Sequence, residues 1–120
     1  MIKVAIVEDF ELIREDLKEL IDSQEDMQVV WAAETGVQAV ELAEKEATDI
    51  ILMDIRMPIM DGIQATEKIR TISLTVPIIA VTAYAFYTEQ QQAIQAGCNA
   101  VISKPYSLER LKETIESYIG

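Results

Sequence analysis

The sequence predicts an α/β domain: a parallel sheet of five strands with helices on both faces. Five short apolar runs alternate with five segments whose apolar residues recur at helical spacing. The runs are rich in Ile and Val and do not alternate strictly with polar residues, which is typical of strands buried on both faces. Alternating strands and helices form parallel sheets with right-handed crossovers.

The elements follow from these patterns in chain order. Strands are expected over residues 2–7, 27–33, 50–53, 78–81 and 100–102. Helices are expected over residues 11–23, 36–47, 62–72, 87–96 and 108–119. Thr35 and Ser107 are expected to cap the helices that follow them, and Gly97 is expected to end the fourth helix. Val37, Val40 and Ala43 are expected to face inward from the second helix. The apolar face of the third helix is expected to carry Ile63, Thr66, Ile69 and Ile72.

Composition limits the classes of function. The 120 residues suit a single domain, 1–120, and half of them are hydrophobic, which argues against disorder. Ten basic residues against 21 acidic ones give a net charge of −11, which argues against nucleic-acid binding. Without histidine, Ser-His-Asp and Cys-His chemistry are excluded, and Cys98 has no disulfide partner within the chain. We expect no signal peptide and no membrane span, and therefore a cytoplasmic protein.

Polar residues follow the expected strands at the edge where open parallel sheets bind ligands. Glu8 and Asp9 follow the first strand, and Asp54 follows the third. Thr82 follows the fourth strand, and Lys104 comes soon after the fifth. Taken singly, each residue is more often a helix cap, a turn residue or a solvated side chain. Their joint placement at successive strand ends favours a functional site.

Three converging carboxylates repel one another, and a hard divalent cation would relieve that repulsion. Mg²⁺ suits oxygen ligands of this kind. Lys104 adds a positive charge, and the Thr82 hydroxyl can donate a hydrogen bond to an anionic oxygen. This chemistry suits phosphoryl transfer onto Asp54 as the nucleophile.

These motifs resemble the receiver (CheY-like) domain of two-component response regulators over essentially the whole chain. The resemblance is carried by Glu8-Asp9, the MDIRMPIMDG segment around Asp54, Thr82-Ala83 and Lys104-Pro105, in that order. It implies the flavodoxin-like strand order 2-1-3-4-5, of which CheY itself is a familiar example. It also implies a cis peptide bond before Pro105.

The resemblance further implies a role for each site residue. Asp54 would accept a phosphoryl group from a phosphohistidine on a sensor histidine kinase or a histidine phosphotransfer protein. Asp9, Asp54 and the backbone carbonyl of Arg56 would bind Mg²⁺, with Glu8 acting mainly through water. Lys104 would bind the phosphoryl oxygens, and Thr82 would move toward them. The surface near the fourth and fifth helices would then change and control an output, while homodimerisation stays open.

The chain departs from the family pattern at several positions. Val101 stands where many members carry an aromatic residue that swings inward on activation. Tyr106 is expected to serve in packing rather than to take the place of that aromatic residue. Arg56 and Tyr84 border the expected phosphoryl site. There they would hinder the water that hydrolyses the phosphoryl group and so prolong the phosphorylated state. Alternatively, Arg56 would pair with a surface carboxylate and Tyr84 would face solvent.

Two other classes of protein compete with a signalling switch. A phosphohydrolase of the haloacid dehalogenase type also uses an aspartyl nucleophile and magnesium, but it needs a second aspartate where this chain has Arg56. A flavin-binding module would need a phosphate-binding loop after the first strand, where Glu8 and Asp9 would repel phosphate. The switch is expected to assist only its own phosphorylation and dephosphorylation.

Overall fold

The computed structural model describes residues 1–56, 60–83 and 86–119. The strands are β1 (Ile2–Val7), β2 (Met27–Ala33), β3 (Ile50–Asp54), β4 (Ile78–Thr82) and β5 (Ala100–Ser103). The helices are α1 (Glu11–Asp22), α2 (Gly36–Lys45), α3 (Gly62–Arg70), α4 (Tyr87–Ala96) and α5 (Leu108–Ile119). The expected elements are confirmed, with small differences at their ends.

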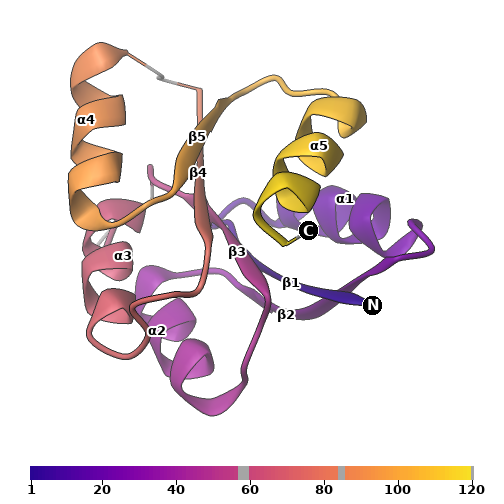
Figure 1. The fold of residues 1–120 in the computed structure, drawn as a ribbon, viewed down its shortest axis with the longest axis horizontal. Helices are drawn as coiled ribbons and strands as arrows, with labels where there is room; N and C mark the ends of the chain where they lie inside the picture. The colour runs from indigo at the N-terminus through magenta and orange to yellow at the C-terminus, as the bar shows by residue number, and fades with distance from the viewer. Residues whose placement is uncertain (57–59, 84–85, 120) are drawn as a thin grey trace.

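A five-stranded parallel sheet in the order β2-β1-β3-β4-β5 forms the centre of the domain. Figure 1 shows α1 and α5 on one face of the sheet and α2, α3 and α4 on the other. This is the flavodoxin-like arrangement that the family resemblance implies. The chain changes direction of winding between β1 and β3, so the carboxyl ends of these two strands border a crevice.

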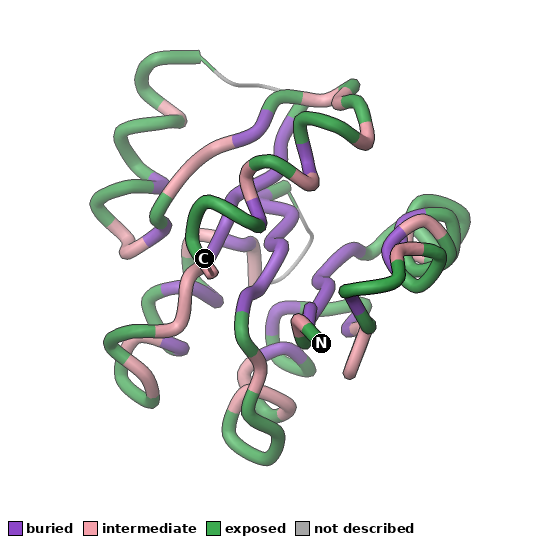
Figure 2. The backbone as a smooth tube through the Cα atoms, turned by 45° about the vertical axis from the view of Figure 1, so that its right-hand side comes forward, coloured by how far each residue is buried: buried purple, intermediate pink, exposed green. Residues whose placement is uncertain are grey.

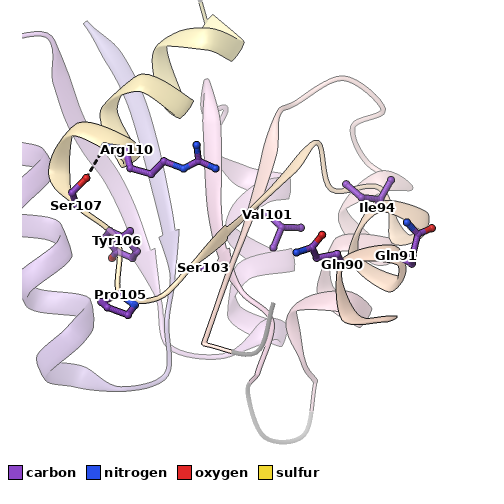
Figure 3. A pocket seen from close by; sticks show the side chains of 9 residues that line it. All are labelled: Gln90, Gln91, Ile94, Val101, Ser103, Pro105, Tyr106, Ser107 and Arg110. Carbon is purple, nitrogen blue, oxygen red and sulfur yellow. Dashed lines mark hydrogen bonds between the residues drawn. The ribbon is translucent and has the colours of Figure 1, made fainter. Parts of the chain in front are cut away.

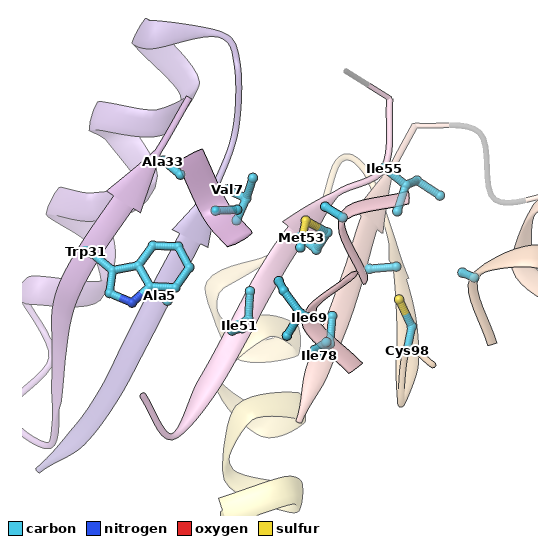
Figure 4. Packing of buried hydrophobic residues seen from close by; sticks show 14 residues of the cluster. Ala5, Val7, Trp31, Ala33, Ile51, Met53, Ile55, Ile69, Ile78 and Cys98 are labelled. Carbon is cyan, nitrogen blue, oxygen red and sulfur yellow. The ribbon is translucent and has the colours of Figure 1, made fainter. Parts of the chain in front are cut away.

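Two apolar cores hold the helices on the sheet. Every residue of β3 and β4 is buried, as expected for central strands covered on both faces. The core under α2, α3 and α4 includes Trp31, Met53 and Ile69, whose side chains pack together between the layers in Figure 4. The core under α1 and α5 includes Leu17 and Leu111. Figure 2 shows the burial concentrated in the strands and on the inner faces of the helices.

Local signals fix most helix ends as expected. The Thr35 hydroxyl accepts a hydrogen bond from the backbone of Gln38, and Ser107 caps α5 in the same way through Arg110. Gly97 ends α4 with a φ of 119°, a left-handed conformation that favours glycine.

Two expectations about inward-facing residues are wrong. Val37 is 46% exposed, because Ala39 rather than Val37 occupies the buried face at the start of α2. Ile72 is 40% exposed and lies beyond the end of α3. The Arg70 guanidinium binds the carbonyls of Ser73 and Val76, which holds this segment in a turn instead of continuing the helix.

Candidate functional site

Four neighbouring strands bring polar side chains to one edge of the sheet. Glu8 and Asp9 directly follow β1. Asp54 is the last residue of β3, and Thr82 is the last residue of β4. Lys104 directly follows β5, and its backbone N–H donates to the carbonyl of Thr82 at 2.8 Å. The residues that the sequence places at this edge therefore do lie there.

The three carboxylates form a compact cluster. One oxygen from each of Glu8, Asp9 and Asp54 lies within 4.8 Å of the other two. Glu8 and Asp54 are buried, with 4% and 5% of their surfaces exposed, whereas Asp9 is open to solvent. A cluster made only of oxygen donors, with one member accessible from solvent, fits Mg²⁺ better than a softer metal.

Burial and mutual repulsion favour one proton on the buried Glu8–Asp54 pair. Burial, the hydrogen bond with Glu8 and the charge of Glu8 raise the pKa of Asp54 to about 8 against the opposing effect of Lys104. Burial alone would raise the pKa of Glu8, but its hydrogen bonds with Asp54, Phe10 and Lys104 lower it overall. The two acids thus titrate as a pair in which Asp54 holds the proton. A cation would displace that proton, because metal ligands must be deprotonated.

Lys104 supplies the positive charge of the site. Its ammonium nitrogen lies 3.1 Å from Glu8 Oε1 and 3.9 Å from Asp54 Oδ1. The peptide bond between Lys104 and Pro105 is cis, as the family resemblance implied. Lys104 therefore contacts both buried acids, with the shorter contact to Glu8.

A further acidic residue, which the sequence patterns did not single out, joins the site from α4. Thr82 Oγ1 donates a hydrogen bond of 2.6 Å to Glu89 Oε1. Arg56 donates to the other oxygen of Glu89 from Nη2 at 2.6 Å and from Nε at 3.2 Å. Arg56 thus does pair with a carboxylate, but that carboxylate is largely buried, with only 12% of the side chain exposed.

The start of α3 lies directly against the backbone of Asp54. The backbone N–H of Gly62 donates to the carbonyl of Ile55 at 3.2 Å. A Cβ at Gly62 would lie 2.4 Å from the carbonyl oxygen of Asp54 and 2.5 Å from Ile55 Cα, so no side chain fits there. Asp61 forms a capping box with Gln64, which fixes the start of α3 at this point.

Four other residues that the sequence brings to attention pack in or against the apolar cores. Val101 and Tyr106 are half-buried, and Tyr106 packs against the core under α1 and α5, as expected. Trp31 and Cys98 are buried in the opposite core. The expectation for Tyr84 concerns a residue outside the described part of the chain.

A groove lies between α4 and α5, across β5. It has a volume of about 650 Å³. Figure 3 shows Gln90 and Ile94 on the α4 side, Val101 on β5, and Tyr106 and Arg110 on the α5 side. The α4 side of the groove begins at the residue after Glu89, so the groove and the site share one helix.

The strand order and the edge site together define a phosphorylation-controlled signalling switch. The chain belongs to the response regulator receiver domain family, whose model matches residues 4–116. Domains of this family act as signalling switches rather than as classical enzymes. The phosphohydrolase alternative finds no support among the matches.

The polar-differentiation response regulator DivK of Brucella ovis is 39% identical over 123 residues, which cover 98% of this chain and 95% of DivK. The sensor histidine kinase RcsC of Salmonella typhi is 42% identical over 86 residues, which cover 72% of this chain. That match spans only 9% of RcsC, so the chain corresponds to a small part of that protein.

Solved structures of receiver domains superpose closely on the chain. The receiver domain of the sensor histidine kinase PA1611 from Pseudomonas aeruginosa has a TM-score of 0.89 and 34% identity, covering 98% of this chain and 97% of that one. That structure holds a magnesium ion in its active-site cleft. The response regulator domain of Thermotoga maritima CheB has a TM-score of 0.91 and 32% identity, covering 99% and 96%.

Within the described residues, no helix is both long and apolar enough to cross a bilayer.

Proposed function

We propose that Asp54 is the phosphoryl acceptor of this receiver domain and that a partner phosphohistidine is the donor. The observation that carries the proposal is the position of the Asp54 carboxyl group, at the end of a buried strand between an acidic pair and Lys104. A sensor histidine kinase or a histidine phosphotransfer protein would supply the phosphoryl group. The chain has no histidine, so the donor lies outside the 120 residues.

Mg²⁺ is the proposed cofactor. Asp9, Asp54 and the backbone carbonyl of Arg56 would bind it directly, and Glu8 would act mainly through water. When bound, Mg²⁺ would neutralise charge on the phosphoryl oxygens. The oxygen-only donor set and the unfavourable charge of the buried Asp54 carboxylate without a cation support this assignment.

The transfer uses residues that the fold already positions. A carboxylate oxygen of Asp54 forms a bond to phosphorus while the N–P bond of the phosphohistidine breaks. The bonding electron pair stays on the imidazole nitrogen, which takes up a proton. Lys104 would move its ammonium group from Glu8 toward the phosphoryl oxygens, and Thr82 would donate its hydroxyl to one of them. The domain would assist only its own phosphorylation and dephosphorylation.

The phosphorylated state would differ at the surface formed by α4 and α5. This surface includes the groove beside β5. The change of the surface would control an output domain or a downstream protein. Residues 1–120 would act as one receiver domain in the cytoplasm. The net charge of −11 supports the absence of direct nucleic-acid binding.

Intact mass after incubation with acetyl phosphate and Mg²⁺ tests the proposal. One added phosphoryl group is expected on the wild-type chain and none on Asp54→Asn or after chelation. Asp61→Asn is the matched control, because Asp61 lies in the loop after β3 and caps α3 outside the acidic cluster. Full phosphorylation of Asp54→Asn would contradict the proposal.

A further inference from the structure

Glu89 occupies an unusual place for an acidic residue in the first turn of a helix. It is the third residue of α4, where a glutamate commonly reaches back to the helix cap or faces solvent near the positive end of the helix dipole. Here the cap residue is Phe86, and the Glu89 carboxylate is instead largely buried against Thr82 and Arg56. Its two oxygens accept one hydrogen bond from Thr82 and two from Arg56.

Both of these donors also belong to the edge where Asp54 lies. The backbone N–H of Arg56 donates to Asp54 Oδ1 at 3.1 Å while its guanidinium binds Glu89. Thr82 ends the strand next to the one that Asp54 ends. Glu89 therefore binds the Thr82 hydroxyl and the Arg56 guanidinium, two donors that lie at the same edge of the sheet as Asp54.

A phosphoryl group on Asp54 would compete for the same two donors. It adds about −1.5 to −2 charges and three acceptor oxygens. Hydrogen bonds from a hydroxyl and a guanidinium to such oxygens are charge-assisted and strong. The new charge would also repel the Glu89 carboxylate, so both effects favour separation of Glu89 from its partners.

We propose that Glu89 is a positioning residue that latches α4 to the unphosphorylated site through Thr82 and Arg56. This inference rests on the proposed phosphorylation of Asp54. On phosphorylation, Thr82 and Arg56 exchange their hydrogen bonds to Glu89 for hydrogen bonds to the phosphoryl group. The first turn of α4 then loses its contacts with these two residues.

The released helix borders the groove between α4 and α5. Gln90, Gln91 and Ile94 line the groove from α4. Gln90, which directly follows Glu89, lies next to Val101 in Figure 3. A shift of the first turn of α4 therefore changes the shape of one wall of this groove. Glu89 thus connects the chemistry at Asp54 to the surface that would meet a partner.

The test uses beryllofluoride with Mg²⁺ as a phosphoryl mimic and follows its binding by amide and arginine side-chain NMR. Glu89→Ala removes the competitor and should bind beryllofluoride about three- to thirtyfold more tightly than the wild type. Glu89→Gln keeps an acceptor for Thr82 but loses the ion pair with Arg56, so its gain should be smaller. The Arg56 Nε–H resonance should move on beryllofluoride binding in the wild type and should already be displaced in unliganded Glu89→Ala.

A thermodynamic cycle separates a latch from a general loosening of α4. In a Thr82→Val background, Glu89→Ala should gain clearly less affinity than in the wild type, because one of the competing donors is gone. Gln92→Ala, an exposed change on the same helix, should leave the affinity unchanged.

Three results would overturn the latch: unchanged affinity in Glu89→Ala, weaker affinity, or equal gains in both backgrounds. If Glu89→Ala does not fold, the beryllofluoride affinity of Glu89→Gln is compared with that of the wild type instead. Failure of the proposed phosphorylation itself looks different. In that case the wild type does not bind beryllofluoride, or Asp54→Asn binds it equally well.

Discussion

Lys104 Nζ lies 3.1 Å from Glu8 Oε1, which is closer than its 3.9 Å contact with Asp54 Oδ1. The lysine therefore neutralises the acid that holds the negative charge, while Asp54 holds the proton. This arrangement stabilises the acidic site without a cation, but it also places a positive charge beside two of the carboxylates that a cation would contact.

Removal of that charge should strengthen Mg²⁺ binding. We expect Lys104→Met to bind Mg²⁺ about three- to tenfold more tightly in a calorimetric titration, because a competing positive charge near the carboxylates is lost. The same variant should lose most of the beryllofluoride response. Lys68→Met, which changes an exposed lysine of α3, is the control. Weaker Mg²⁺ binding by Lys104→Met would show that the lysine supports the cation rather than opposing it.

The raised pKa of Asp54 predicts a pH-dependent stability without metal. The pKa rises from its ordinary value of 3.8 to about 8 in the native state, so the native chain holds a proton that the unfolded chain releases. The free energy of unfolding therefore falls as pH rises through this window and levels off above it. In EDTA, Asp54→Asn should raise the free energy of unfolding by about 1 to 3 kcal/mol at pH 8 and by less at pH 5.

Urea unfolding at the two pH values measures this difference. Asp16→Asn, an exposed change on α1, should give nearly equal stability to the wild type at both. A stabilising effect of Asp54→Asn that is larger at pH 5 would refute the proton assignment.

Metal removal should lower thermal stability, because the proposed Mg²⁺ would bind the carboxylate cluster only when the chain is folded. At a Mg²⁺ concentration of 100 times Kd, the gain in the free energy of unfolding should be about 2.7 kcal/mol. Asp9→Asn should lose most of this gain, whereas Asp26→Asn, an exposed change before β2, should keep it. Calorimetric scans with and without EDTA measure the effect, and an equal Mg²⁺ response in Asp9→Asn would exclude Asp9 as a ligand.

Gly62 should tolerate no side chain. In Gly62→Ala the new Cβ would meet the Asp54 carbonyl oxygen at 2.4 Å, a backbone atom that cannot yield easily. We expect a loss of about 2 to 4 kcal/mol in the free energy of unfolding and weaker Mg²⁺ binding, because the end of β3 is displaced. Glu67→Ala, on the exposed side of α3, should change neither property measurably.

The strands and most helix ends could be predicted because each depends on local sequence. β3 and β4 are continuous apolar runs, and Thr35 and Gly97 have the side chain or backbone freedom that their cap positions need. The acidic site was also predictable, because parallel strands deliver their last residues to one edge. Val37 was misplaced because helical spacing does not show which residue of the first turn faces the sheet.

Glu89 could not be found from spacing, because its contacts depend on how α4 lies against the ends of β3 and β4. It meets Arg56 across 33 positions of sequence and Thr82 across seven. The available signal was an acidic residue at the third position of a helix whose cap residue, Phe86, has no polar side chain. That signal indicates an acid able to bind elsewhere, but the partner follows only from the three-dimensional arrangement.

The most direct test of the account is to locate the phosphoryl group on the chain. Borohydride reduction converts an aspartyl phosphate to homoserine, so peptide mapping after phosphorylation by acetyl phosphate and Mg²⁺ identifies the modified residue. We predict homoserine at position 54 and unmodified Glu8 and Asp9. Modification at Asp9 or at a hydroxyl residue, with Asp54 intact, would contradict it.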